Sequence, residues 1–155
     1  MNYKIAGIGD RMLDRDHDEI SGLLLEMNFF AKDEAEIRKQ RFFRKLSQLT
    51  LTHFALEEEM MSFTGYPGME AHVLRHQAMI HDIRELSYWP SGQKGLLARL
   101  PAGLLWESHT NHVEKEDQAF GLWLNGQPGL SARISKGCRE GLDVSRPDCA
   151  VNFMG

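Results

Sequence analysis

The segment HFALEEEMMSFTGYPGMEAHVLRH, residues 53–76, is the most informative part of this chain for its architecture. Its middle, residues 64–68, reads Thr-Gly-Tyr-Pro-Gly, a cluster that favours a turn and interrupts a helix. On either side apolar residues recur at helical spacing, and there is no sustained alternation of apolar and polar residues that would indicate a strand. The segment therefore predicts two helices, over about residues 36–62 and 69–87, joined by a short turn.

The same helical periodicity occurs in two further segments, residues 12–31 and 96–124. Turn-forming residues follow the third and fourth segments, with Trp-Pro-Ser-Gly at 89–92 and Asn-Gly-Gln-Pro-Gly at 125–129. Because proline fits the first turn of a helix best, Pro101 predicts that the fourth helix begins near Leu100.

Four helices with short connections favour an all-α fold. We expect an antiparallel up-down-up-down four-helix bundle over residues 1–125. Residues 126–155 are rich in glycine, proline, serine and charge, and their periodicity is weak. We expect an irregular, loosely packed C-terminal tail there. The alternative is a segment that docks a signalling partner or a second copy of the chain.

Polar residues occupy the faces of these segments that should point inward. A helix turns about 100° per residue, so positions i, i+3, i+4 and i+7 share a face. The polar residues that fall among the apolar ones are His17; His53 and Glu57; His72 and His76; and His109, His112 and Glu116, with Asp117 at the edge of the last face. His81 lies on the opposite side of its helix, so we expect it to be exposed and not a ligand.

Such a set of buried histidines and carboxylates favours a shared metal centre. A single histidine on an apolar face is usually a core residue with a hydrogen-bond partner. Burying five or six imidazoles together with unpaired carboxylates is costly, whereas metal ions accept the imidazole lone pairs and neutralise the carboxylates. Nitrogen and oxygen ligands without thiolate suit iron, manganese, zinc or copper. The number of ligands exceeds what one ion uses, so we expect two.

Periodicity leaves the second carboxylate ligand open. Glu116 follows His112 by four residues, which is about one helical turn. Asp117 follows His112 by five residues and would lie roughly 140° away from it on a regular helix. Spacing alone therefore favours Glu116.

Several motifs resemble those of hemerythrins, and of bacterial hemerythrins most closely. They are His53-Phe54-x-x-Glu57-Glu58-Glu59-x-Met61, then Gly65-Tyr66-Pro67, then His72-x-x-x-His76, then His112-Val113-x-x-x-Asp117. Asp14-x-x-His17 looks like the segment that carries the family's first ligand. The resemblance covers roughly residues 5–124, and seven ligand positions match in order and spacing.

The resemblance implies a non-heme di-iron centre with an oxo or hydroxo bridge. One iron would be held by His72, His76 and His112, the other by His17 and His53, and Glu57 and Asp117 would bridge them. This ligand set leaves one position open, on the two-histidine iron, where dioxygen binds. The resemblance thus selects Asp117, with Glu116 as the fallback.

The function that the resemblance implies is reversible dioxygen binding for storage, delivery or buffering. Dioxygen would be the partner, and no substrate would be turned over, so we do not expect an enzyme. One alternative is an oxygen or redox sensor that signals through the tail or an oligomer interface. Another is a di-iron enzyme that reacts with peroxide or nitric oxide and uses His109.

The last helix departs from the hemerythrin pattern at two positions. The family usually carries Trp-Leu in the motif W-L-x-x-H, where this chain has Ser108 and His109. The family's leucine lines the dioxygen pocket, so we expect His109 beside the open position. There it can donate a hydrogen bond to the ligand, shuttle protons or ligate iron. The alternative is that it turns aside and bonds another core polar group such as Glu116.

Composition and charge exclude other classes of protein. The net charge of −4 provides no basic stripe for nucleic acid. No apolar run approaches the roughly 20 residues of a membrane span. The N-terminus lacks the pattern of a signal peptide, so we expect a cytoplasmic protein without a membrane partner. Cys138 and Cys149 are too few for a disulfide framework and are expected to be reduced thiols.

Overall fold

The computed structural model describes residues 7, 9–27, 36–89, 96–127 and 129. Its elements are α1 (Arg11–Met27), α2 (Glu36–Thr64), α3 (Met69–Ser87), α4 (Leu96–His112), the π-helix η1 (Val113–Asp117) and α5 (Gln118–Asn125). No strand occurs within these residues, which confirms the all-α prediction. The end of the first predicted helix, most of the predicted tail, and both cysteines lie outside the described residues.

The predicted beginning of the fourth helix was wrong. α4 begins at Leu96, and Pro101 lies inside it rather than in its first turn. Proline removes one backbone donor from a helix interior. The helix nevertheless continues through this position, where Pro101 and Ala102 are buried.

Local sequence signals explain where the described helices begin and end. The Oδ1 atom of Asp10 accepts hydrogen bonds from the backbone N–H groups of Met12 (2.9 Å) and Leu13 (3.2 Å) and so caps α1. α2 ends at Thr64, and the next residue is Gly65, whose φ of 70° favours glycine. The N–H of Tyr66 then bonds the carbonyl of Met61 at 3.0 Å, which closes the helix end. After this turn α3 begins at Met69, five positions beyond the last residue of α2.

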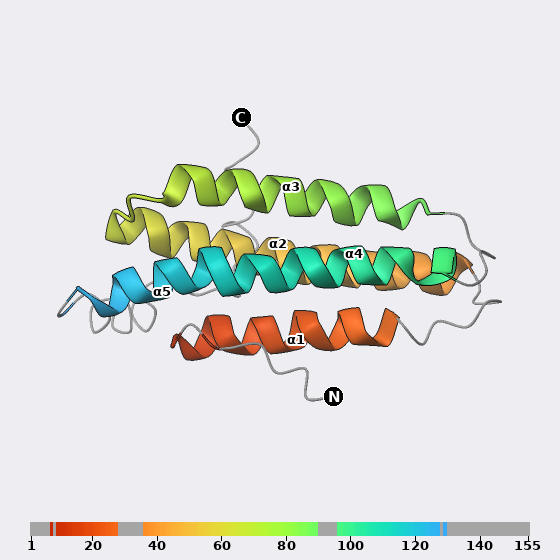
Figure 1. Ribbon diagram of the computed structural model, residues 1–155, viewed down its shortest axis with the longest axis horizontal. Helices are drawn as coiled ribbons and strands as arrows, with labels where there is room; N and C mark the ends of the chain where they lie inside the picture. Colours follow the sequence, from red (N-terminus) through yellow and green to blue (C-terminus); the bar gives the residue numbers. More distant parts are fainter. Residues whose placement is uncertain (1–6, 8, 28–35, 90–95, 128, 130–155) are drawn as a thin grey trace.

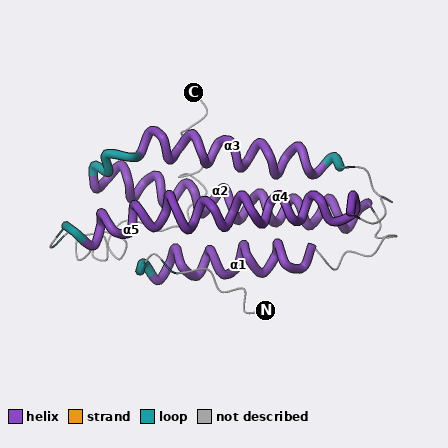
Figure 2. The backbone as a smooth tube through the Cα atoms, viewed as in Figure 1, coloured by secondary structure: helices purple, strands orange, loops and turns teal. Residues whose placement is uncertain are grey.

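The helices form a closed bundle. α1 packs against α2 and α4, and α3 packs against the same two helices. In Figure 1 the helices lie lengthwise beside one another, and α4, η1 and α5 form one continuous rod. Figure 2 shows the described turns at the two ends of the bundle. Among the described helices, none combines the length and apolar character needed to cross a lipid bilayer.

Two apolar clusters fill the interior, one toward each end. The first consists of Leu13, Leu56, Met60, Met61, Phe120 and Leu124. The second consists of Ile20, Leu23, Leu24, Phe42, Phe43, Leu46, Ile83 and Leu105. Along α1, His17 lies between residues of the two clusters, and along α2 His53 does so as well. A polar layer is therefore enclosed between two apolar ones, which excludes water from it.

Candidate metal centre

The polar layer collects side chains from every long helix of the bundle. α1 contributes His17, α2 contributes His53 and Glu57, α3 contributes His72 and His76, α4 contributes His112, and η1 contributes Asp117. None of these seven side chains is more than 4% exposed. His81 is exposed, as expected from its place on the helical wheel. The structure thus brings together all seven residues that the sequence motifs single out.

The ligand atoms converge in two groups, within each of which they lie no more than 4.8 Å apart. The first group contains Glu57, His72, His76, His112 and Asp117, and the second contains His17, His53 and Asp117. We call these the three-histidine pole and the two-histidine pole. Asp117 belongs to both.

At the three-histidine pole, imidazole nitrogens surround two carboxylates. Nε2 of His112 lies 2.9 Å from Oδ1 of Asp117, and Nε2 of His72 lies 3.1 Å from the same oxygen. Nε2 of His76 lies 3.1 Å from Nε2 of His112 and 3.2 Å from Oε2 of Glu57. All three imidazoles therefore present the same nitrogen to the interior of the cluster.

The two-histidine pole is built in the same way with one imidazole fewer. Nε2 of His17 lies 3.0 Å from Nε2 of His53 and 3.1 Å from Oδ2 of Asp117. Nε2 of His53 lies 3.9 Å from Oε2 of Glu57. Because Oδ1 of Asp117 faces one pole and Oδ2 faces the other, this carboxylate lies between them.

This arrangement fits metal ions better than it fits a network of hydrogen bonds. Both carboxylate oxygens of Glu57 and of Asp117 are buried, and they form no hydrogen bond of suitable geometry. Buried carboxylates without such partners are costly unless a cation lies beside them. Two metal–nitrogen bonds of about 2.1 Å at right angles place the nitrogens about 3.0 Å apart. The pairs His17–His53 and His76–His112 have this spacing.

The carboxylates and imidazoles of the cluster shift one another's pKa values. Burial and the charge of Asp117 raise the pKa of Glu57, but the adjacent imidazoles of His72 and His76 outweigh both and hold it at about 2. Burial lowers the pKa of His72, but the Asp117 and Glu57 carboxylates outweigh burial and raise it to about 9. Protons on histidine therefore balance carboxylate charge, and a metal ion would displace them.

The π-helix η1 places Asp117 in the cluster. In a π turn the hydrogen bond runs from i to i+5, so a residue five positions after His112 returns to the same face. Glu116, which helical spacing favoured, lies at the edge of the layer with its side chain 33% exposed. Its Oε1 lies 3.8 Å from Nε of the exposed Arg75. The expectation from regular periodicity was therefore wrong at this position.

Two further carboxylates lie near the outer nitrogens of ligand histidines, and one of them, Glu58, is within hydrogen-bond distance. Nδ1 of His76 lies 2.7 Å from Oε1 of Glu58, and Nδ1 of His53 lies 3.8 Å from Oδ2 of Asp16. A carboxylate bonded to the outer nitrogen, as Glu58 is, orients a ligand histidine and raises its basicity. Sequence reasoning missed both residues, although each directly adjoins a predicted ligand along the chain.

A comparison with protein families agrees with this cluster. A family model described as the hemerythrin HHE cation binding domain matches residues 8–124. The chain belongs to the hemerythrin family. This hemerythrin is 26% identical over 113 residues to the bacteriohemerythrin of Stenotrophomonas maltophilia (strain R551-3), with 73% of each chain covered. No solved structure matches it. The resemblance inferred from the motifs is thus confirmed.

His109 of this hemerythrin belongs to neither pole. It is buried, and its Nε2 lies 3.1 Å from Oγ of Ser21, so its polar partner is Ser21 and not Glu116. Its ring centroid lies 6.1 Å from that of His17. Burial, reinforced by His17 and His53 when they are protonated, lowers the pKa of His109 to about 3, so the imidazole is uncharged at neutral pH.

Proposed function

We propose that this hemerythrin holds two iron ions and binds dioxygen reversibly, as a protein for storage, delivery or buffering. The ligands would be His72, His76 and His112 at one pole, His17 and His53 at the other, with Glu57 and Asp117 shared. When bound, the reduced di-iron centre supplies the electrons and the open coordination position that dioxygen requires. We also propose that the helices over residues 1–125 alternate in direction, as in an up-down-up-down bundle. A cytoplasmic location is part of the same proposal.

The observation that carries the proposal is the unequal number of imidazoles at the two poles. Three histidines meet at one pole and two at the other, while the Asp117 carboxylate faces both. Ions of the same preferred geometry would therefore be unequally saturated, and the open position would fall at the two-histidine pole. The apolar clusters on both sides separate that position from bulk solvent.

The test is metal content combined with visible spectroscopy. The reduced protein is expected to contain about two irons per chain and to develop a visible charge-transfer band on exposure to air. The band should disappear on deoxygenation. Protein that is produced with sufficient iron and still contains no metal would refute the metal site. A band that never reverses would refute reversible binding.

A second candidate is a di-iron enzyme that reacts with peroxide or nitric oxide. The position of His109, a buried imidazole beside the two-histidine pole, favours it, because imidazole is a common acid–base group. This candidate predicts repeated turnover of hydrogen peroxide or nitric oxide when a reductant is supplied. The sensor alternative depends on the tail, which lies mostly outside the described residues.

A further inference from the structure

Thr50 carries a buried hydroxyl that has no partner. The chain has four threonines, and the hydroxyls of Thr52, Thr64 and Thr110 each donate to the backbone carbonyl four residues earlier. This is the usual way in which a helical threonine is satisfied. Thr50 is only 2% exposed, and its Oγ1 forms no hydrogen bond. Leaving a buried hydroxyl unpaired is unfavourable, so this position calls for an explanation.

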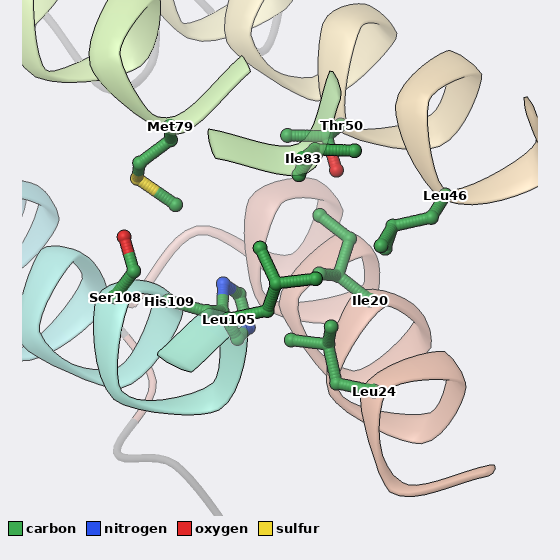
Figure 3. A pocket seen from close by; sticks show the side chains of 9 residues that line it. All are labelled: Ile20, Leu24, Leu46, Thr50, Met79, Ile83, Leu105, Ser108 and His109. Carbon is green, nitrogen blue, oxygen red and sulfur yellow. The ribbon is translucent and has the colours of Figure 1, made fainter. Parts of the chain in front are cut away.

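The Thr50 side chain lines a cavity in the bundle interior. The volume is about 10 Å³, roughly the space that one water-sized molecule needs. The lining is mostly apolar, and its polar members are Thr50, Ser108 and His109. Figure 3 shows these side chains among the helices, with the oxygen of Thr50 pointing into the space between them.

The polar side of the cavity lies next to the two-histidine pole. Thr50 precedes His53 by three residues on α2, so both lie on the inner face of that helix. The ring of His109 contributes to the cavity wall and stands edge-on to His17. A molecule at the pole would therefore meet the cavity at its Thr50 and His109 side.

Ser21 holds the His109 ring in this place. Ser21 lies one turn after His17 on α1, and His109 lies one turn before His112 on α4. The 3.1 Å hydrogen bond between Oγ of Ser21 and Nε2 of His109 connects the two helices within the buried layer. Both residues are buried, so water does not compete for this bond.

We propose that Thr50 and His109, with Ser21 positioning His109, form a polar subsite that hydrogen-bonds a small anionic ligand at the two-histidine pole. The ligand class is a small anion with exposed lone pairs, such as azide. Thr50 donates its hydroxyl hydrogen. His109 donates the N–H of Nδ1, while its Nε2 accepts the hydroxyl hydrogen of Ser21. The inference rests on the proposed di-iron function, because the pole must hold a metal for the anion to ligate.

Azide binding to the oxidised di-iron protein tests the subsite. Its dissociation constant is measured by visible titration, and the infrared stretch of bound azide is compared in H₂O and D₂O. We expect Thr50→Val and His109→Leu each to weaken azide binding by about tenfold or more, because a lost hydrogen bond to a charged group costs about 1.5–3 kcal/mol. Thr50→Ser should restore the affinity. The solvent isotope shift of the infrared band should shrink in both weakened variants.

Matched variants separate a subsite from a general loss of structure. Thr52→Val lies on the same helix and removes a hydroxyl that is exposed and bonded to the backbone, so it should leave azide binding unchanged. His109→Gln, which keeps an N–H donor, should retain more affinity than His109→Leu. Ser21→Ala should weaken binding, and the double variant with His109→Leu should be no weaker than His109→Leu alone.

The outcomes distinguish this inference from the proposed function. Two irons per chain and an unchanged azide affinity in Thr50→Val and His109→Leu would overturn the subsite and leave the di-iron proposal standing. A protein that never binds two irons would overturn both. Equal weakening by Thr50→Val and Thr52→Val would also overturn the subsite, because it would reflect the helix and not the cavity.

Discussion

Oδ1 of Asp117 lies 2.9 Å from Nε2 of His112, although Asp117 comes five positions after His112 along the chain. On a regular α-helix a separation of five residues would turn them roughly 140° apart. The π-helix Val113–Asp117 accommodates one extra residue in the turn and returns Asp117 to the inner face. The helix on either side keeps its own register, since Leu105 and Phe120 are both buried.

This relationship predicts that a chain lacking Lys115 still binds metal. Lys115 is exposed, and its removal would shorten the π turn to an ordinary α turn, with Asp117 then four positions after His112. A chain lacking the exposed Glu107 is the control, because deletion in regular helix rotates the preceding residues by about 100°. We expect near-normal metal content and helicity for the first chain and loss of helicity for the second, because the buried Ala102 and Leu105 would turn out of the core. An equal loss of helicity in both chains would show that the π turn does not arise from one added residue.

The two neighbouring carboxylates should behave differently. Asp117→Asn is expected to weaken metal binding by more than the roughly 10–100-fold that loss of an outer partner causes, because Asp117 faces both poles. Glu116→Gln should leave the metal content unchanged, because that side chain is partly exposed beside Arg75. Metal analysis after dialysis against a chelator measures both. If Glu116→Gln lost the metal instead, the assignment of ligands would be wrong.

Glu58 is expected to support the three-histidine pole. Its carboxylate accepts the Nδ1 hydrogen of His76 at 2.7 Å, which leaves Nε2 free to face the cluster. Glu58→Gln should lower metal affinity roughly 10–100-fold without unfolding the protein. Glu59→Gln, an exposed neighbour, is the matched control. Competition with a chelator gives the affinity, and equal values for both variants would count against the role of Glu58.

Metal binding should release protons at neutral pH. The pKa of His72 is raised to about 9 in the metal-free cluster, so this imidazole is protonated at pH 7. A metal ion requires its lone pair, so loading each chain with metal should release at least the proton of His72, and metal affinity should fall as the pH decreases. Calorimetry in buffers of different ionisation enthalpy measures the release. Identical heats in all buffers would contradict it.

His109 should make stability depend on pH in the acid range. Its pKa is lowered to about 3 in the folded chain, below the ordinary 6.5 of the unfolded one. Below pH 6.5 the unfolded chain therefore binds a proton that the folded chain does not. The free energy of unfolding then falls by about 1.4 kcal/mol for each unit by which the pH decreases. Denaturant unfolding should show a smaller loss between pH 6.5 and 5 for His109→Leu than for wild type. The exposed His81→Leu should match wild type, and a matching slope for His109→Leu would exclude this effect.

Most of the helical architecture and the set of converging residues could be predicted from the amino-acid order. Helical spacing depends on the chain alone, so the inward placement of His17, His53, His72 and His76 follows from their apolar neighbours. Turn chemistry at Gly65 likewise places the end of α2 near the predicted residue. The family motifs added the choice of Asp117, which spacing did not favour.

Packing between helices set the remaining features. Helical periodicity assumes a turn of 100° at every residue, and a π turn departs from that value. Periodicity therefore could not predict η1 or the exposure of Glu116. The pairing of His109 with Ser21 and the contact of His76 with Glu58 join residues of different helices. The unpaired hydroxyl of Thr50 likewise depends on what the neighbouring helices bring to it. The amino-acid order thus specifies which side chains turn inward, whereas their partners depend on how the helices pack, because partners from different helices meet only in the assembled bundle.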